Sequence, residues 1–172
     1  MEFLIPGLIL VALMVYASTK IKKNAARAYE EEAIETDAFS ILKPDGFINP
    51  TNGDPRFAFL AYSKEFGTGN SDNIREASAW ISIYVDDNFD DICDRAKESV
   101  TEIISAKSYQ SGGSRHCIIA AESEENGKPI GVYYKIASND PKVYKLHISV
   151  LSEHKDNYLR RIEEMIDSFV VK

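Results

Sequence analysis

Acidic residues are the first side chains whose spacing points to chemistry, because a calcium-binding loop also places oxygen atoms at alternate positions. Asp86, Asn88 and Asp90 begin such a loop suitably. The pattern then fails, since its sixth position is Asp91 in place of glycine and its twelfth is Lys97 in place of glutamate. The same residues are typical of a helix start, where an Asn or Asp caps the first turn and further acids favour the positive end of the helix dipole. We therefore expect a helix here and no metal site.

A histidine and a cysteine, the residue types of a nucleophile and its base, are adjacent at His116 and Cys117. Neighbouring residues on a strand point to opposite faces of a sheet, so these two side chains cannot pair. We expect His147 on the solvent face of its own strand and His154 at the start of the last helix. No two histidines have the spacing of metal ligands.

The short motifs of known enzymes are absent from the sequence. No serine lies in a GxSxG motif, and Gly67-Thr68-Gly69 lacks the lysine and the helix of a phosphate loop. The cysteines, Cys93 in an expected helix and Cys117 in an expected strand, are interpreted as reduced thiols, although their spacing leaves a bridge open. With no acid–base, nucleophilic or metal constellation, the sequence predicts a non-enzymatic protein without a cofactor.

One group of side chains is a candidate contact surface. The strand expected at residues 78–85 alternates, with isoleucine and valine on one face and Trp80, Ser82 and Tyr84 on the other. Aromatic side chains on an otherwise polar sheet face often mark a ligand or partner site. Packing under a helix or a loop would produce the same pattern, and the sequence leaves both readings open.

The charge balance argues against one class of partner. The 172 residues include 20 Lys and Arg against 27 Asp and Glu, a net charge of −7, and nearly all the excess acid lies beyond residue 29. An acidic surface repels phosphate backbones, so we expect no nucleic-acid partner. Residues 36–172 are sufficient in number for one domain with a single core.

The first nineteen residues are apolar and almost uncharged, with no polar stripe at helical spacing. As a helix they would extend about 28 Å, close to the hydrocarbon thickness of a bilayer. A cleaved signal peptide and a buried core helix compete with a membrane anchor. A signal peptide is disfavoured because the segment has no positively charged start and no good cleavage site. A buried core helix is disfavoured because the rest of the chain is too small to enclose a helix that is apolar on every side. The sequence therefore predicts a single transmembrane helix at residues 1–19 that contacts the lipid bilayer.

Cationic side chains follow this apolar segment. We expect Tyr16 at the headgroup level, with Lys20, Lys22, Lys23 and Arg27 just beyond it. Because these charges lie only on the C-terminal side, the positive-inside rule predicts a single-pass protein with its N-terminus outside and its C-terminal domain in the cytoplasm.

The elements that would position these residues follow from periodicity. Residues 20–35 are expected to continue the first helix as a stalk, and residues 36–172 to form the domain. Strands are expected at 38–43, 57–62, 78–85, 116–121, 130–137 and 143–151, with loops at 49–56 and 67–73 and an Asn-Gly hairpin turn at 126–127. A helix is expected from about residue 89 to Lys107, with Ile103 and Ile104 in its apolar stripe, and a second helix near the C-terminus. The predicted fold class is α+β, an antiparallel sheet covered on one face by two amphipathic helices.

Two segments resemble the PsbP-like family of small extrinsic and lipoprotein domains. These are FSILKPDGF at 39–47, and YKLHISVL at 144–151 with the helix that ends at Asp167-Ser168-Phe169. The similarity covers roughly residues 36–170. It implies an antiparallel sheet with flanking helices and an accessory role at a membrane complex. That family has no common catalytic residues to transfer.

These observations predict a membrane-anchored accessory domain that docks to a membrane protein assembly. The alternative is a module for a small ligand or lipid, with a pocket of several hundred Å³ between the aromatic sheet face and the two loops.

Overall fold

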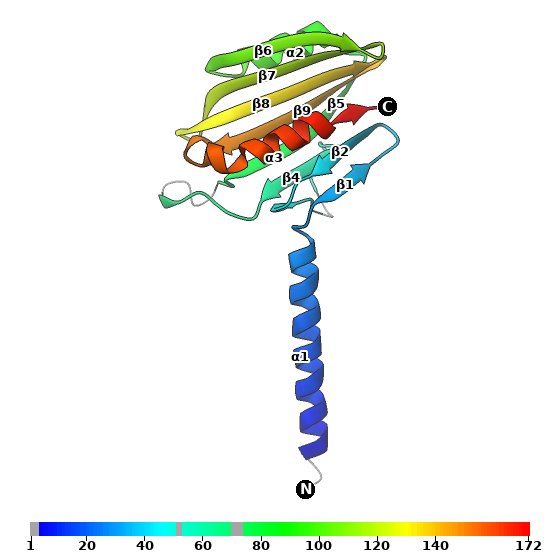
Figure 1. Cartoon of the computed structure of the whole chain (residues 1–172), viewed down its shortest axis with the longest axis vertical. Coiled ribbons are helices and arrows are strands. Elements are labelled where there is room, and N and C mark those ends of the chain that lie inside the picture. The colour runs from blue at the N-terminus through cyan, green and yellow to red at the C-terminus, as the bar shows by residue number, and fades with distance from the viewer. Residues whose placement is uncertain (1–3, 51–52, 70–73) are drawn as a thin grey trace.

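The computed structural model describes residues 4–50, 53–69 and 74–172, with the side chains of residues 4–10 and 24 excepted. A long N-terminal helix extends away from an α+β domain (Figure 1). The helices are α1 (Leu4–Arg27), α2 (Phe89–Glu98) and α3 (Lys155–Ser168), with the short η2 (Ser152–His154) before α3. The strands are β1 (Glu32–Glu35), β2 (Phe39–Lys43), β3 (Phe47–Ile48), β4 (Phe59–Ser63), β5 (Ala77–Val85), β6 (Glu102–Ser111), β7 (Ser114–Glu125), β8 (Lys128–Asn139), β9 (Lys142–Leu151) and β10 (Val170–Val171).

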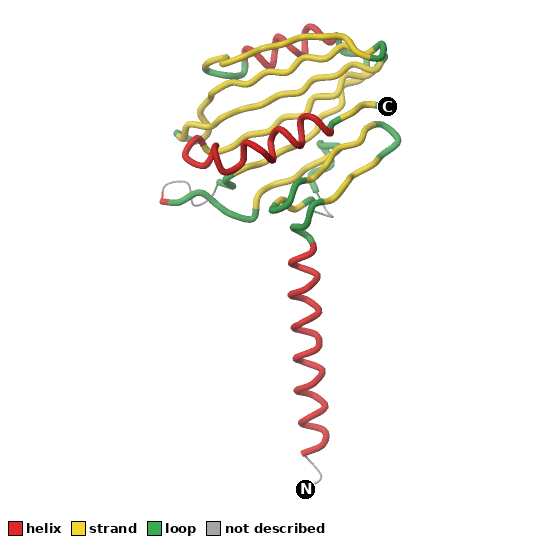
Figure 2. Tube along the Cα trace, in the orientation of Figure 1, coloured by secondary structure: helices red, strands yellow, loops and turns green. Residues whose placement is uncertain are grey.

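Strands dominate the domain and form two antiparallel sheets (Figure 2). The large sheet has seven strands in the order β3-β4-β5-β9-β8-β7-β6, and the small sheet has the order β1-β2-β10. Hairpins join β6 to β9 in sequence, so each of these strands pairs with the next. The predicted α+β class with antiparallel pairing is therefore confirmed for the domain.

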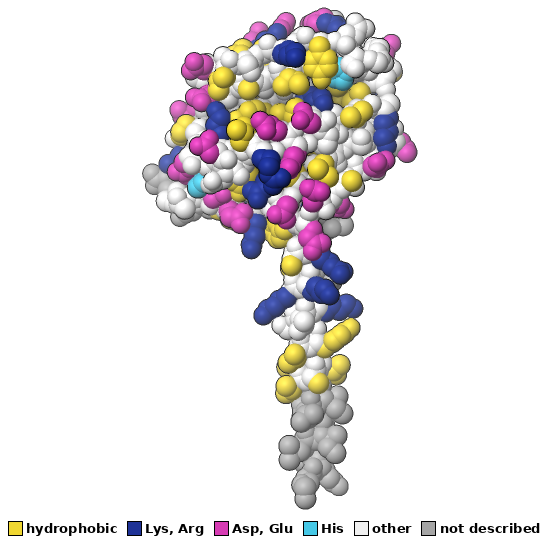
Figure 3. Space-filling view, viewed as in Figure 1, with side chains coloured by type: hydrophobic (Ala, Val, Ile, Leu, Met, Phe, Trp, Pro, Cys, Tyr) yellow, Lys and Arg dark blue, Asp and Glu magenta, His cyan; other side chains and the backbone are white. Residues whose placement is uncertain are grey.

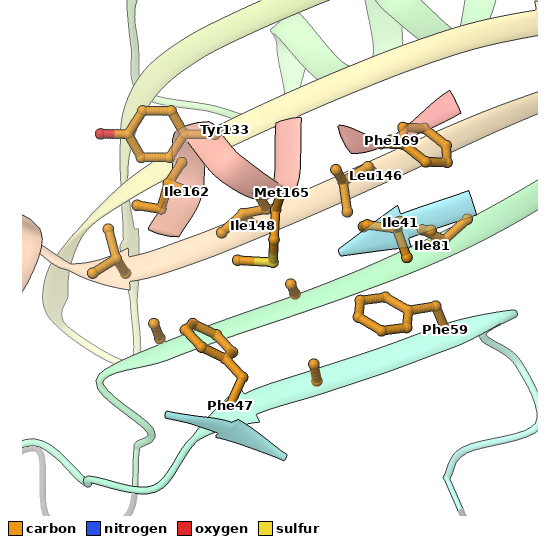
Figure 4. Close-up of a cluster of buried hydrophobic side chains, with 14 of the residues drawn as sticks. Ile41, Phe47, Phe59, Ile81, Tyr133, Leu146, Ile148, Ile162, Met165 and Phe169 are labelled. Atoms are coloured by element: carbon orange, nitrogen blue, oxygen red, sulfur yellow. The ribbon is translucent and has the colours of Figure 1, made fainter. Parts of the chain in front are cut away.

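One face of the large sheet, which we call the closed face, packs against α3 and the small sheet. Alternate side chains of β5 and β9 point into this core, where they contact the apolar stripe of α3. Figure 4 shows Met165 of α3 beside Ile148 of β9, with Ile162 on one side of them and Leu146 on the other. Lys135 also lies here, and its Nζ donates to the carbonyls of Ile166 and Phe169 at 2.7 Å each, at the end of α3.

The opposite face, which we call the open face, carries α2. The buried residues of α2 pack on β7 and β8. Because α2 and α3 contact different faces, the predicted arrangement with both helices on one face is wrong. The alternation of β8 explains the difference, since Tyr133 points to the closed core while Val132 and Tyr134 point to the open one.

The predicted helix from residue 89 to Lys107 is too long. Asn88 does cap the helix, with its side chain accepting from the Asp90 amide at 2.8 Å, but α2 ends at Glu98. The next residues form β6, whose β-branched Ile103 and neighbours pair with β7. Long-range pairing has overridden a helical spacing of apolar residues.

The predicted helical stalk over residues 20–35 is also only partly present. The helix ends at Arg27, and β1 begins at Glu32. Lys43 explains where the helix stops, because its buried Nζ donates to the carbonyls of Ala28 (3.1 Å), Glu30 (2.5 Å) and Phe47 (2.9 Å). The carbonyls of Ala28 and Glu30 lie just beyond the end of α1, where no further helical amide is available to them.

The predicted membrane anchor is contradicted by the structure. Among the residues that the structure describes, no helix combines the length and the apolar character that crossing a bilayer requires. The described side chains of α1 are apolar at residues 11–16, and the cations Lys20, Lys22, Lys23 and Arg27 follow. In Figure 3 the apolar side chains of the helix are followed by dark blue ones nearer the domain. The single-pass topology and the localisation predicted from residues 1–19 are therefore corrected. Residues 1–3 and the side chains of 4–10 lie outside the described part.

Candidate interaction surface

The candidate site is built where β5 and β9 pair on the open face. Their register places Trp80 opposite His147 and Ser82 opposite Lys145. The Trp80 and His147 rings have centroids 3.8 Å apart, and Trp80 also lies 5.6 Å from Phe57. His147 meets Tyr134 of β8 edge-on at 4.7 Å. These four rings, which we call the aromatic row, run across the sheet from the segment before β4 to β8.

His147 is the titratable group of the aromatic row. Burial, together with a smaller effect of the nearby Lys145 ammonium, lowers the pKa of its imidazole to about 3. Its Nε2 is enclosed and has no hydrogen-bond partner within the described part of the protein. The ring is therefore neutral at physiological pH and stacks as an aromatic group. The sequence-based expectation that His147 faces solvent is wrong, because Trp80 covers it.

The predicted site residues Ser82 and Tyr84 continue the open face along β5. Both are half-buried. The Lys145 Nζ lies 5.4 Å from the Tyr84 ring centroid and 5.8 Å from that of Tyr134, within the range of cation–π attraction. The guanidinium of Arg95 from α2 lies 5.8 Å from the Tyr84 ring centroid. Tyr84 therefore has two cations near its ring, while Trp80 has two aromatic rings near its own.

A pocket of about 200 Å³ opens beside Trp80. Its walls come from β5 and the segment before it, from β9, and from β8 with the β7–β8 turn. The lining residues are Ile74, Arg75, Ser78, Trp80, Glu125, Asn126, Ile130, Ser149, Val150 and Leu151. Sites for drug-sized ligands usually have about 300–1,000 Å³. This pocket therefore has room for a side chain of a partner rather than for a typical small ligand.

Arg75 makes one wall of this pocket rigid. Its guanidinium lies over the Phe66 ring at 3.7 Å and the Tyr62 ring at 4.5 Å, and its Nη1 donates to the carbonyls of Ser63 (3.2 Å) and Lys64 (2.7 Å). Stacked, hydrogen-bonded arginine loses little further entropy when a partner binds. The pocket is therefore largely pre-formed on this side.

Other chemically interesting side chains serve the core. Cys93 and Cys117 are free and buried between α2 and the sheet. The Tyr158 hydroxyl donates to Glu76 at 2.9 Å, and burial together with this bond raises the pKa of that phenol. Within the described ranges, no three His, Cys, Asp or Glu side chains gather closely enough to hold a metal ion.

The candidates from the N-terminal segment lie elsewhere. Tyr16, Lys20, Lys22, Lys23 and Arg27 are exposed along α1. They do not join the aromatic row, which belongs to the large sheet. The structure thus separates the two groups of predicted site residues. The group Trp80, Ser82 and Tyr84 lies on the open face, and the group on α1 does not.

Comparison with solved structures identifies the architecture. LpqN of Mycobacterium tuberculosis, involved in cell envelope biogenesis, matches with a TM-score of 0.57 at 9% identity, covering 83% of this chain and 91% of that one. The Ran-binding protein Mog1p of Saccharomyces cerevisiae matches with a TM-score of 0.54 at 12% identity, over 83% and 96%. The cyanobacterial PsbP protein of Synechocystis sp. PCC 6803 matches with a TM-score of 0.51 at 13% identity, over 83% and 92%.

The chain has a PsbP-like fold. The predicted resemblance is confirmed at the level of the fold. No protein-family model and no curated protein matches the sequence. At such low identities, the PsbP-like fold positions the site but does not determine what the site binds.

Sequence reasoning missed several residues of this site. Phe57 and Tyr134 lie in segments that give no sign of meeting Trp80, because their proximity depends on the strand order β4-β5-β9-β8. His147 carried a usable signal. It lies between Leu146 and Ile148 in an alternating strand, so its side chain points to the face opposite the closed core. The partner strand of β5 could not be read from the sequence.

Proposed function

We propose that this PsbP-like domain is a non-enzymatic protein-interaction module that binds a partner protein on its open face. The pocket beside Trp80 carries the proposal. Interface hot spots concentrate in tryptophan, tyrosine and arginine around well-packed pockets for single side chains, and Trp80 and Arg75, which both line this pocket, supply two of these types.

The chemistry of the face indicates the kind of partner side chain. The aromatic row offers ring surfaces, and the pocket floor is apolar at Ile130 and Leu151. One cation and one anion, Arg75 and Glu125, stand at its walls. An apolar or aromatic anchor residue flanked by polar groups fits such a site. The name of Mog1p, a Ran-binding protein, agrees with protein recognition on this fold.

A second candidate, a small-ligand module, is less well supported. The pocket is smaller than the several hundred Å³ that this alternative predicted, and its walls are not those of the two expected loops. Of those loops, residues 51–52 and 70–73 lie outside the described part. A second pocket of about 180 Å³ lies along residues 49–60 and is of similar size.

Site-specific photo-crosslinking in the native host tests the proposal. A photoreactive residue replaces Ser82 on the open face, and in a matched chain it replaces Leu159, which is 42% exposed on α3. We expect Ser82 to crosslink reproducibly to one defined protein, and we expect Trp80→Ala to abolish that product while the fold is retained. Equal crosslinking from Leu159, or a product that Trp80→Ala leaves unchanged, would contradict the proposal.

A further inference from the structure

The two edges of the large sheet are very different. One edge is β3, a strand of two residues, and the other is β6, a strand of ten residues at the top of the domain in Figure 1. Every residue of β6 is exposed. Among the described residues, no backbone group outside the sheet bonds to this strand, and α2 packs instead on β7 and β8. β6 therefore presents a long row of unpaired amides and carbonyls.

Natural edge strands usually carry devices against pairing, such as charges, proline, bulges or a short length. β6 has one bulge, between Ile103 and Ser105, and one lysine, Lys107, in the regular stretch that follows. That stretch, residues 105–111, contains no proline and no acid. The edge is therefore only weakly protected from another strand.

The turn after β6 tells which of its residues direct their backbone groups outward. Gly112 and Gly113 form a two-residue connection with φ values of 58° and 87°, as in a type I′ hairpin. In such a hairpin the flanking pair, Ser111 and Ser114, exchanges both hydrogen bonds. Because hydrogen-bonded and non-bonded pairs alternate along an antiparallel ladder, the odd residues of 105–111 bond to β7. Ala106, Ser108 and Gln110 therefore point their amides and carbonyls away from the sheet.

We propose that two copies of this chain pair antiparallel through β6, with the two-fold axis at Ser108, and so join their large sheets into one. This register uses every outward group of the regular stretch. Ser108 pairs with Ser108 of the second copy, and Ala106 pairs with Gln110 in both directions, which gives six backbone hydrogen bonds by the alternation above. The bulge on one side and the turn on the other lie equally far from Ser108, so the two regular stretches coincide end to end.

Side-chain charge favours the same register. Directly opposite residues of an antiparallel pair lie on the same face of the sheet, and like charges there are unfavourable. A two-fold axis at Lys107 would place the Lys107 side chains of the two copies directly opposite each other. The axis at Ser108 instead places each Lys107 opposite Tyr109 of the second copy, where the ammonium meets a ring that is 38% exposed. The sequence of β6 is thus self-complementary, which identifies a second copy as its occupant.

Sedimentation equilibrium of the full chain, compared between variants, tests this pairing. We expect a concentration-dependent dimer of the 19.3 kDa chain. Ser108→Pro removes an outward amide and should weaken dimerisation about tenfold or more, whereas Ser108→Ala should leave it unchanged. Since all variants retain α1, differences between them report on β6. A monomer at every concentration, or a dimer that Ser108→Pro leaves intact, would overturn the proposal.

A charge exchange tests the register without a proline. Tyr109→Lys places a lysine at position 109 opposite Lys107 of the other copy. Because this happens once on each side of the axis, the two like-charge pairs should weaken the dimer several-fold. Adding Lys107→Glu to that variant places a glutamate opposite each lysine and should restore the dimer. Failure of the double variant to recover would exclude the axis at Ser108. This result is independent of the open face, because Trp80 does not contact β6.

Discussion

The two faces of the large sheet differ in how completely they are covered. On the closed face, α3 and the small sheet enclose a continuous core in which Leu146, Ile148 and Met165 have no exposed surface. On the open face, α2 covers β7 and β8, and the aromatic row beside it is mostly half-buried. The same strands therefore stabilise the domain through one face and present a pre-formed pocket through the other. Changes on the closed face should alter stability, and changes at the aromatic row should alter recognition.

Met165→Ala should have the largest effect on stability. The side chain is fully buried at the centre of the closed core, so its truncation loses apolar burial and leaves a cavity. We expect the free energy of unfolding to fall by about 2–5 kcal/mol in urea denaturation. A loss below 1 kcal/mol would show that the two faces do not differ as described.

Acid should destabilise the domain through the aromatic row. The pKa of His147 is about 3 in the folded protein and about 6.5 when unfolded, so the unfolded chain binds the proton more readily. The stabilising contribution is complete above pH 6.5 and is lost as the pH falls toward 3. Between pH 7 and 4.5 we expect this group to account for about 1–3 kcal/mol.

His147→Phe provides the control, because it keeps an aromatic ring against Trp80 without a titrating group. Denaturation curves of this variant should show a shallower decline between pH 6.5 and 4.5 than those of the wild-type chain. Identical pH profiles would contradict the burial of the imidazole.

Trp80→Ala should have a smaller effect on stability than either change above, about 1–2 kcal/mol, because the indole is half-buried. Its effect on partner binding should be larger, about tenfold or more. Leu159→Ala removes an exposed apolar side chain on α3 and should change neither quantity. A Trp80→Ala protein that binds its partner normally would remove the functional difference between the faces.

Ser82→Ala should have the smallest effect, within about 0.5 kcal/mol in thermal unfolding. The residue is half-buried and its side chain is small, so the substitution removes only one hydroxyl group. A large loss of stability would indicate that this part of the open face supports the core.

Local chemistry made parts of the fold predictable. Strand alternation assigned Trp80, Ser82 and Tyr84 to one face, and the Asn126-Gly127 pair located the β7–β8 hairpin. The first turn of α2 followed from its cap at Asn88. Each of these features depends on residues that are close in the sequence.

Other features of the fold and the site could not be predicted because they depend on contacts between residues far apart in the sequence. The spacing of Ile103 and Ile104 fits the apolar stripe of a helix. Their segment is nevertheless the strand β6, because it pairs with β7. Lys43 ends α1 by binding carbonyls about fifteen residues earlier, which no local pattern reveals. The aromatic row needs four segments in a particular order, so only Trp80 of its rings could be singled out as a site residue.

Trp80 is the one tryptophan of the chain, so its fluorescence reports on the open face directly. The most direct test is a titration of the full-length protein with the partner identified by crosslinking, following Trp80 emission and its quenching by acrylamide. If the open face is the binding surface, the emission shifts to shorter wavelength and quenching decreases as the complex forms. Saturated binding with an unchanged spectrum and unchanged quenching would contradict this account.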